Sequence, residues 1–456
     1  AAHLYSTLVF RTTAGELVGD LAESWKAVND TAWEFKLRPG VAFPSGESLD
    51  AAAVKWNIER ILNPATQSRN RTLYTQIKAI EAVDATTLRI VTSEPFPVLP
   101  AQMTMLFLMP PKWTASHNPA VEASGTGPYE IVSYKSGDRM VLKARAGYYG
   151  ARPVFDEVTL RMIPENAVRV AAIRAGEVDF VRNIAPNDVD QIKAGGKATG
   201  GWTPSIRTMV VKMDTTKPPF NNKMLREAVN HAIDRKAIID GFYNGWSQVA
   251  ACQILTDRYF GYNADLKPVA YDPEKAMKLI AASGVSKPTA VFEVPVGQYL
   301  LGSEIAQVIA AQVQEVGFNI QFKESEYASW ISRYTNNGIA AMTFMGHAWP
   351  TMDADGQLQL YAGDNKAGYW NDKVYGDALA AARSSVDPAE RKKQYKIATD
   401  EMCREAPAAA LRAAALPGSG GERQRRPIRR LPAPGLAIGH GRLAASRDRL
   451  SRPPIG

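Results

Sequence analysis

The chain has 456 residues, of which 45% are hydrophobic and 22% are charged. This length exceeds one ordinary domain, and the composition is that of a globular protein with a large core, so two or three domains are expected. The sequence contains no run of about 18 or more apolar residues, so no membrane-spanning helix is expected.

The net charge of +8 is concentrated near the C-terminus. The forty residues from Pro417 hold nine Arg, one Glu and one Asp, so the preceding 416 residues carry a net charge of only +1. A nearly neutral body has no electrostatic footprint for DNA or RNA, and no nucleic-acid partner is expected. Because residues 412–456 are rich in Arg, Pro, Gly and Ala without periodicity, we expect them to be disordered.

Two features of the sequence bear on the cellular compartment: the two cysteines and the first ten residues. Cys252 and Cys403 can form one disulfide in an oxidising compartment or remain two buried thiols, and the sequence does not decide between these alternatives. The opening AAHLYSTLVF has no basic start and no cleavage pattern, so no signal peptide is recognised in this chain.

The first predicted elements are strands and a helix. In WEFKLRPG, apolar residues at 33, 35 and 37 alternate with charged ones, which predicts a half-buried strand that ends at Pro39. Residues 48–62 have helical spacing, and 125–149 predict a glycine-rich turn followed by a β-hairpin that turns at 136–138. The GxGP at 125–128 lacks the further glycine and the helix of a phosphate loop, so we expect a close chain crossing there.

Helices with clear start signals follow. Residues 221–234 place apolar residues on one helical face after Asn221 or Asn222 as the cap. Asp-Pro at 272–273 and again at 387–388 predicts two further helix starts, the second with Glu390 in the capping-box position. An amphipathic helix at 303–317 leads directly into a strand at 318–322, an order that indicates α/β layering.

Five motifs occur in the order seen in one family. They are LAESWKAVNDTAWEFKLRPGVAF, GTGPYEIVSY, FNNKMLREAVNHAIDRKAII, YDPEKAMKLIAASG and DPAERKKQYKIATDEMCREAPA. Over about residues 5–407 the chain resembles the extracellular solute-binding proteins of the peptide/nickel (family 5) ABC importers. The resemblance implies an α/β fold, the two-lobed periplasmic binding protein fold of the class II type with an extra subdomain and mixed sheets flanked by helices.

The same resemblance implies a division of the chain and a cellular role. The extra subdomain of lobe I would span 1–130, the lobe I core 131–254 and lobe II 255–411, before the atypical tail 412–456. The protein would be a monomeric periplasmic receptor that closes on a small-molecule or short-peptide ligand and delivers it to the transmembrane subunits of an ABC permease. Family members begin with a signal peptide and a first strand that do not precede Ala1 here, so we expect a mature or truncated start.

The stretch FMGHAWPTMDADGQLQLYAG, residues 344–363, is the predicted ligand-binding segment. Oligopeptide-binding members place a tryptophan and an ammonium-binding aspartate here, and by ungapped comparison these positions hold His347 and Pro350. An upstream arginine that can meet a peptide carboxylate is replaced by Phe344. The TMDAD at 351–355 is more similar to the T-x-(D/E)-A-D pattern of glutathione-binding members, which implies a glutathione-like or modified small peptide as the ligand.

Seven side chains in and near this stretch are candidates for ligand binding. A carboxylate can hold a ligand ammonium at about 1.5–3 kcal/mol, an arginine can meet a ligand carboxylate bidentately, and indole or phenol rings offer flat contact area. Each has a structural alternative: the carboxylates as turn or cap residues, the arginine on a solvated helix face, and the rings as core or turn anchors. The candidates are Asp355, Asp353, Trp349, Arg333, His347, Tyr369 and Trp370.

Metal and catalytic motifs are not recognised. None of the five histidines shows HxH or HxxxH spacing or a cysteine partner, and His347 with Asp353 gives two ligands where a stable transition-metal site needs three or four. We therefore expect no bound metal and no cofactor, with a receptor for nickel or a metal chelate as the alternative function. The sequence has no GxSxG, HExxH or P-loop, so we expect no catalytic residue; an enzyme acting on peptides or sugars is the less favoured hypothesis.

Overall fold

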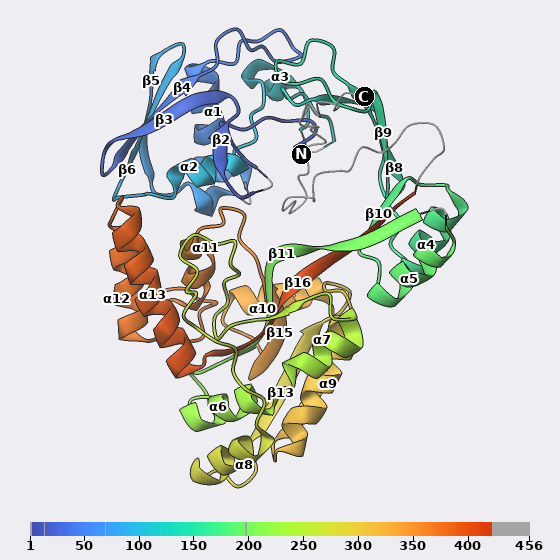
Figure 1. Ribbon diagram of the computed structural model, residues 1–456. Helices are drawn as coiled ribbons and strands as arrows, with labels where there is room; N and C mark the ends of the chain where they lie inside the picture. The colour runs from blue at the N-terminus through green and yellow to red at the C-terminus, as the bar shows by residue number, and fades with distance from the viewer. Residues whose placement is uncertain (1, 13, 69, 120, 197, 422–456) are drawn as a thin grey trace, which may run out of the picture. The chain divides into compact units, whose positions relative to one another are not determined.

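A computed structural model describes residues 2–12, 14–68, 70–119, 121–196 and 198–421 (Figure 1). These residues form two compact units: the first holds those up to Glu94 and Val98–Ile163, and the second holds Pro95–Pro97 and those from Pro164 onward. The finer domain limits expected after residues 130, 254 and 411 stay predictions. Among the described residues, every helix is too short or too polar to cross a membrane.

The first unit is built around a four-stranded antiparallel sheet in the order β3-β4-β6-β5. The predicted strand at residues 33–37 is β4, where Phe35 and Leu37 are buried, and α1 contacts β5 and β6. The α1 helix begins after Asp50, whose carboxylate accepts a hydrogen bond from the Ala53 N–H. The elements of this unit are β1 (Val9–Arg11), β2 (Leu17–Gly19), β3 (Ala22–Asn29), β4 (Ala32–Leu37), α1 (Ala51–Leu62), β5 (Ile77–Asp84), β6 (Thr87–Thr92), α2 (Leu99–Gln102), α3 (Pro111–Ser116), β7 (Tyr129–Lys135), β8 (Arg139–Ala144), β9 (Glu157–Arg161) and 3-10 turns at Pro64–Thr66, Arg71–Leu73 and Met103–Met105.

The predicted hairpin and glycine crossing in this unit are both confirmed. Strands β7 and β8 pair antiparallel around Gly137, which has a φ of +75°, and β9 extends the sheet. A Cβ on Gly125 would lie 2.4 Å from the Leu4 carbonyl oxygen, and one on Gly127 would lie 2.5 Å from the Leu4 carbonyl carbon. The two glycines therefore allow the N-terminal segment to cross in direct backbone contact.

The second unit is organised by a seven-stranded mixed sheet in the order β10-β16-β11-β15-β13-β14, with β12 paired to β16. Strands β13, β14 and β15 are parallel, whereas β11 runs antiparallel to both β15 and β16. The α/β class with mixed sheets flanked by helices is thus confirmed. The elements are α4 (Asn166–Ala175), β10 (Phe180–Arg182), α5 (Pro186–Ala194), β11 (Ala198–Met213), α6 (Lys223–Ala232), α7 (Arg235–Tyr243), β12 (Gln248–Val249), α8 (Pro273–Ala282), β13 (Thr289–Pro295), α9 (Gly302–Glu315), β14 (Asn319–Ser325), α10 (Tyr327–Thr335), β15 (Met342–His347), α11 (Ala354–Leu358), a 3-10 turn at Gln359–Tyr361, α12 (Lys373–Arg383), α13 (Pro388–Glu405) and β16 (Ala408–Gly421).

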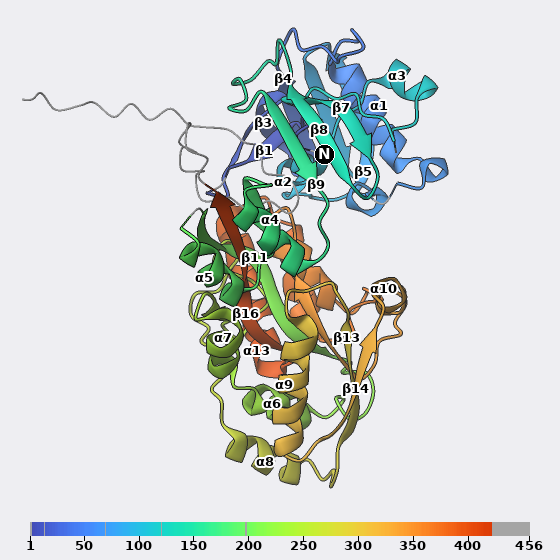
Figure 2. The same cartoon turned by 90° about the vertical axis from the view of Figure 1, so that its right-hand side faces the viewer.

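The two faces of this sheet are covered by different helices. Side chains of α6, α7, α8 and α9 form one apolar core with Met342 and Phe344 of β15, and Figure 2 shows α9 lying along the sheet. The intervening Thr343 points to the opposite face, where its hydroxyl accepts a hydrogen bond from the indole N–H of Trp330 on α10 at 2.9 Å. This alternation is the period of two expected for a strand buried on both faces.

Most predicted helix starts are confirmed, but two local predictions are wrong. Asn222, Asp272 and Asp387 accept hydrogen bonds from N–H groups in the first turns of α6, α8 and α13. Glu390 does not complete a capping box, because its carboxylate accepts instead from the Gln394 amide one turn later. Residues 412–421, expected in a disordered tail, form the last ten residues of β16 paired to β11, since backbone pairing orders a segment regardless of its side chains. Residues 422–456 lie outside the described part.

The open question about the cysteines is also answered. Cys252 and Cys403 form a disulfide with a Cα–Cα distance of 5.2 Å. It links the segment after β12 to the last turn of α13.

Candidate functional site

The carboxyl ends of three parallel strands meet at one edge of the second unit's sheet. The chain leaves β15 at His347 and leaves β13 shortly before Tyr299, while Thr208 of the antiparallel β11 pairs with His347 at the same edge. Open α/β sheets bind ligands outside the carboxyl ends of their parallel strands. We call Arg207, Tyr299, His347 and Trp349 the β15 edge site.

His347 is buried at the end of β15, with only 2% of its surface exposed. Its Nε2 lies 3.0 Å from the hydroxyl of Tyr361. Burial lowers the pKa of His347 well below its ordinary value, and the charges of Lys212 and Arg207 lower it further. The imidazole is therefore neutral at physiological pH.

Lys212 is buried, and it contacts the same Tyr361 ring as this histidine. Its ammonium group donates hydrogen bonds to the Ala367 carbonyl at 2.6 Å and the Leu360 carbonyl at 2.7 Å, and lies 3.9 Å from the centre of the Tyr361 ring. Burial lowers the pKa of Lys212 well below its usual value. The side chain ties β11 to the loop that follows α11.

The neutral state of His347 predicts a pH dependence of stability. Below about pH 6.5 the unfolded chain takes up a proton at this residue that the folded chain does not, so stability falls by up to about 1.4 kcal/mol per pH unit. His347→Asn is expected to remove this contribution, measured as the slope of the unfolding free energy against pH in urea titrations. His231→Gln on α6 is the control. An unchanged slope in the His347 variant would contradict a neutral buried imidazole.

Arg207 and Tyr299 lie on the other side of the β15 edge. The Arg207 Nη1 donates to the Gly346 carbonyl at 2.7 Å, and its guanidinium carbon lies 5.7 Å from the centre of the Tyr299 ring. Burial raises the pKa of Tyr299, while the Gly346 backbone and the Arg207 charge oppose that shift. One hydrogen bond and one ring contact thus hold the arginine at the strand end.

Trp349 is positioned through its backbone and its ring. Its N–H donates to the Tyr259 hydroxyl at 2.7 Å, and the same hydroxyl donates to the Trp349 carbonyl at 3.2 Å. A Cβ on Gly356 would lie 1.9 Å from the indole Cδ1, so the ring lies directly on this glycine of α11. The residue as a whole is half-buried.

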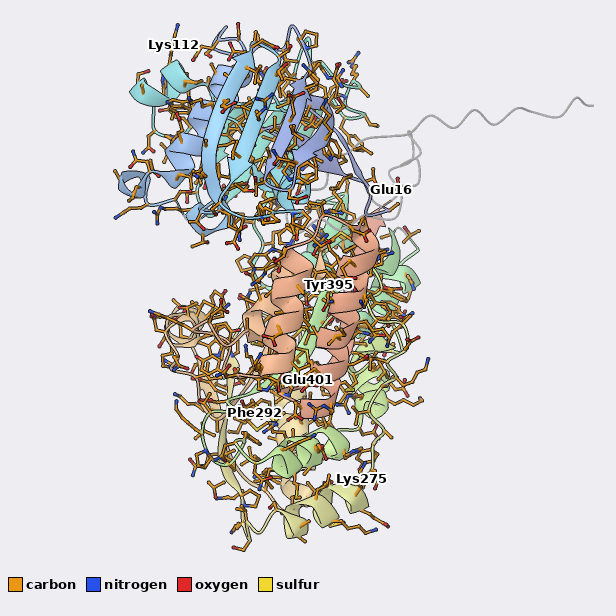
Figure 3. The ribbon with its side chains drawn as sticks, turned by 90° about the vertical axis from the view of Figure 1, so that its left-hand side faces the viewer. Glu16, Lys112, Lys275, Phe292, Tyr395 and Glu401 are labelled. Atoms are coloured by element: carbon orange, nitrogen blue, oxygen red, sulfur yellow. A yellow bond between two sulfur atoms is a disulfide. The ribbon has the colours of Figure 1, made fainter. Side chains whose placement is uncertain are left out.

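Asp353 and Asp355 both have protein partners. Asp353 caps α11, and its carboxylate receives hydrogen bonds from Arg391 Nη2 at 2.8 Å and from the Tyr395 hydroxyl at 2.9 Å; Figure 3 labels Tyr395 on α13. Burial raises the pKa of Asp353, and the Arg391 charge opposes the shift. Asp355 pairs with Arg383 of α12. A ligand role for either aspartate stays a prediction.

The remaining candidates are also engaged within the second unit. Arg333 pairs with the buried Glu293 of β13. The Tyr369 hydroxyl donates to the Tyr334 carbonyl at 2.8 Å, and the Trp370 ring packs 4.6 Å from that of Tyr375. Both rings are almost fully buried. The structure therefore gives these three residues internal contacts, and a ligand role for them stays a prediction.

Sequence reasoning missed Arg207, Tyr299 and Tyr259. The only local signal for Arg207 is a charge at the start of the apolar run TMVV. Tyr259 acts through the main chain of a residue 90 positions away, which no local pattern reveals.

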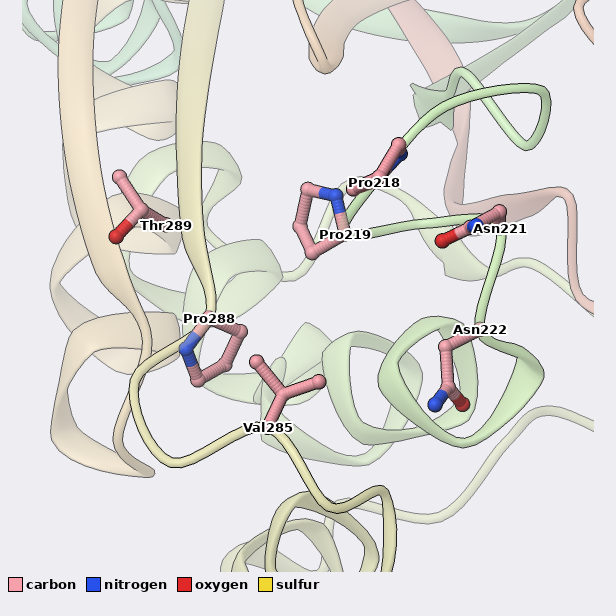
Figure 4. A pocket seen from close by; sticks show the side chains of 7 residues that line it. All are labelled: Pro218, Pro219, Asn221, Asn222, Val285, Pro288 and Thr289. Atoms are coloured by element: carbon pink, nitrogen blue, oxygen red, sulfur yellow. The ribbon is translucent and has the colours of Figure 1, made fainter.

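A hollow of about 590 Å³ lies at the opposite end of the sheet (Figure 4). Thr289, the first residue of β13, and Asn222, the cap of α6, are among its lining residues. Its lining side chains are uncharged, and they come from the segment before α6 and the segment that runs from α8 into the start of β13. Across the described residues, no group of three or more His, Cys, Asp or Glu side chains is arranged to hold a metal ion.

Comparison with known proteins places the chain among solute-binding proteins. The sequence model of "Bacterial extracellular solute-binding proteins, family 5 Middle" matches residues 16–369. The glutathione-binding protein GsiB of Shigella flexneri serotype 5b is 28% identical over 409 residues, which cover 85% of this chain and 79% of that protein. GsiB of Escherichia coli K12 is 28% identical over 410 residues, covering 85% and 78%. These relatives are solute-binding proteins rather than enzymes.

Solved structures support the fold. The structure named "a putative peptide binding protein AppA from Clostridium difficile" superposes with a TM-score of 0.84 at 18% identity, covering 92% of this chain and 90% of that one. The DppA protein of Helicobacter pylori, solved with the peptide STSA, gives a TM-score of 0.80 at 22% identity, covering 92% and 88%. The two-lobed periplasmic binding protein fold expected from the sequence is confirmed.

Proposed function

The chain belongs to the bacterial extracellular solute-binding proteins of family 5, and from this membership we propose that it is the receptor of an ABC importer for a small peptide-like solute. The solute is glutathione-like or a short peptide, as the glutathione-binding relatives suggest. The receptor works in the periplasm as a monomer, performs no catalysis and delivers its solute to the transmembrane subunits of the permease.

The observation that carries this proposal is the match of the family model to residues 16–369. The TMDAD segment follows the β15 edge directly, and its two aspartates are fixed by arginines of α12 and α13. We propose that Trp349 contacts the solute with its indole ring. His347, Asp353, Asp355, Arg333, Tyr369 and Trp370 are proposed to hold the surrounding segments in the shape that presents this contact.

The direct test is native mass spectrometry of the protein purified from its own periplasm, before and after mild unfolding. Release of a species with the mass of a short peptide, together with a rise in melting temperature on adding glutathione or tripeptides, is the expected result. A released species that is not peptide-like would overturn the peptide-like assignment. An empty protein whose melting temperature responds to no peptide would also overturn it.

The contact assigned to Trp349 has its own measurement. Trp349→Ala is expected to weaken solute binding by about 2 kcal/mol, because a rigid aromatic anchor supplies much of the binding energy in such sites. Isothermal titration calorimetry with the released solute measures the change. The matched control is Trp202→Ala on β11, where the indole is 38% exposed. Equal affinities of both variants would contradict the contact.

A further inference from the structure

We propose that Arg207 anchors a carboxylate of the solute through its Nε and Nη2 groups. This inference rests on the proposed receptor function and deepens it, because it names an acidic group that the solute must carry.

The orientation of Arg207 is fixed by a glycine. In the ladder between β11 and β15, Met209 pairs with Gly346, and the arginine side chain reaches across that glycine. A Cβ at residue 346 would lie 2.7 Å from the Arg207 Cδ. With Nη1 bonded to the Gly346 carbonyl and the Tyr299 ring alongside, the guanidinium has little freedom. Such a fixed group loses little entropy when it binds a ligand.

The same guanidinium has one hydrogen bond within the described residues, from Nη1 to the Gly346 carbonyl. In this part of the chain no carboxylate forms an ion pair with Arg207, which leaves Nε and Nη2 as donors for a ligand. Three other arginines of this unit are paired: Arg333 with Glu293, Arg383 with Asp355, and Arg391 with Asp353. The carboxylates near the β15 edge are thus already matched, whereas Arg207 is left with an open pair of donors.

The local charge also favours an acidic ligand. Lys212 is bonded to carbonyl and hydroxyl oxygens; burial lowers its pKa well below the usual value and the Asp214 charge opposes that shift, so the attraction for an anion is assigned to Arg207. Both cations act on His347, whose own charge is suppressed. An anion at the open edge of Arg207 would be attracted by the guanidinium charge.

The free donors are the Nε–H and the neighbouring Nη2–H, which lie parallel on one edge of the planar group. This edge matches the two oxygens of a carboxylate and forms two charge-assisted hydrogen bonds. An amide or ester at the same position accepts only one bond and carries no charge. Arg207 should therefore discriminate a free acid from its amide or ester.

Calorimetry on the full-length protein tests this with matched probes: glutathione against its diethyl ester, and trialanine against trialanine amide. We expect the wild type to prefer each acid by about 10- to 100-fold, and Arg207→Gln to lose this preference while binding the neutral forms as before. Arg207→Lys keeps the charge but not the two-donor edge, so it should retain only part of the preference. Arg174→Gln on α4 is the control, and thermal melting checks that each variant is folded.

The outcomes separate this inference from the proposed function. An acid preference that survives in Arg207→Gln, or a wild type that binds acids and neutral forms equally, overturns the role of Arg207 and leaves the receptor for peptides intact. A wild type that binds no peptide but binds succinate or citrate, with loss in Arg207→Gln, supports the anchor and overturns the peptide-like solute. Failure of every carboxylate probe to bind at millimolar concentration overturns the anchor.

Discussion

Replacing Asp353 with asparagine is expected to lower the free energy of unfolding by about 3–5 kcal/mol. The side chains of Asp353 and its partner Arg391 are only 9% and 7% exposed. Removal of the carboxylate charge leaves the guanidinium buried without a counter-ion, and the Tyr395 hydroxyl loses a charged acceptor. Most of the loss is therefore the cost of the stranded Arg391 charge.

Urea unfolding of three variants measures this effect. Asp353→Asn is compared with the double variant Asp353→Asn/Arg391→Met, which removes both charges and should recover part of the lost stability. Asp355→Asn is the matched control; its partner Arg383 is 31% exposed, so a loss of only about 1 kcal/mol is expected. If Asp353→Asn proved as stable as the wild type but no longer bound solute, the carboxylate would be a ligand group and the structural interpretation would be wrong.

The features predictable from the sequence are those set by neighbours along the chain. The caps at Asp272 and Asp387 depend on a carboxylate two or three residues before the N–H groups it accepts from. The alternation in β4 and the turn at Gly137 are likewise local. The glycine crossing at Gly125 was predictable because unusual backbone freedom at closely spaced glycines has few other uses.

The candidate site was predictable in place but not in its contacts. The segment after β15 is recognisable from its polar and aromatic composition. The partner of Asp353, however, is Arg391 on α13, 38 residues away, and no local pattern around Arg391 indicates this ion pair. Lys212 meets carbonyl groups 148 and 155 residues away. Arg207 is recognisable as a candidate only in the structure, where the pairing of β11 with β15 brings its side chain across Gly346. Whether the Nε and Nη2 donors of an arginine lack a protein partner depends on the packed structure and not on the local sequence.

The disulfide is another contact between distant parts of the sequence. Its removal is the second change that we expect to lower the free energy of unfolding strongly. Cys252 and Cys403 are 151 residues apart in sequence, so the bond restricts a long loop of the unfolded chain. Cys252→Ala/Cys403→Ala should lower the free energy of unfolding by about 2–4 kcal/mol. Urea unfolding with and without reductant measures it: reductant should destabilise the wild type by the same amount and leave the double variant unchanged.

The native fold should survive this loss, because a second link holds the same segment to α13. The Asn263 side chain donates to Asp400 at 2.7 Å and to the Thr399 hydroxyl at 3.1 Å, and its N–H bonds to Gln253, the residue after Cys252. We therefore expect the double variant to keep the Tyr259 contact that positions Trp349, and to bind solute with unchanged affinity. A weakened affinity would show instead that the disulfide positions the β15 edge site. A wild type indifferent to reductant would show that the bond adds nothing to stability.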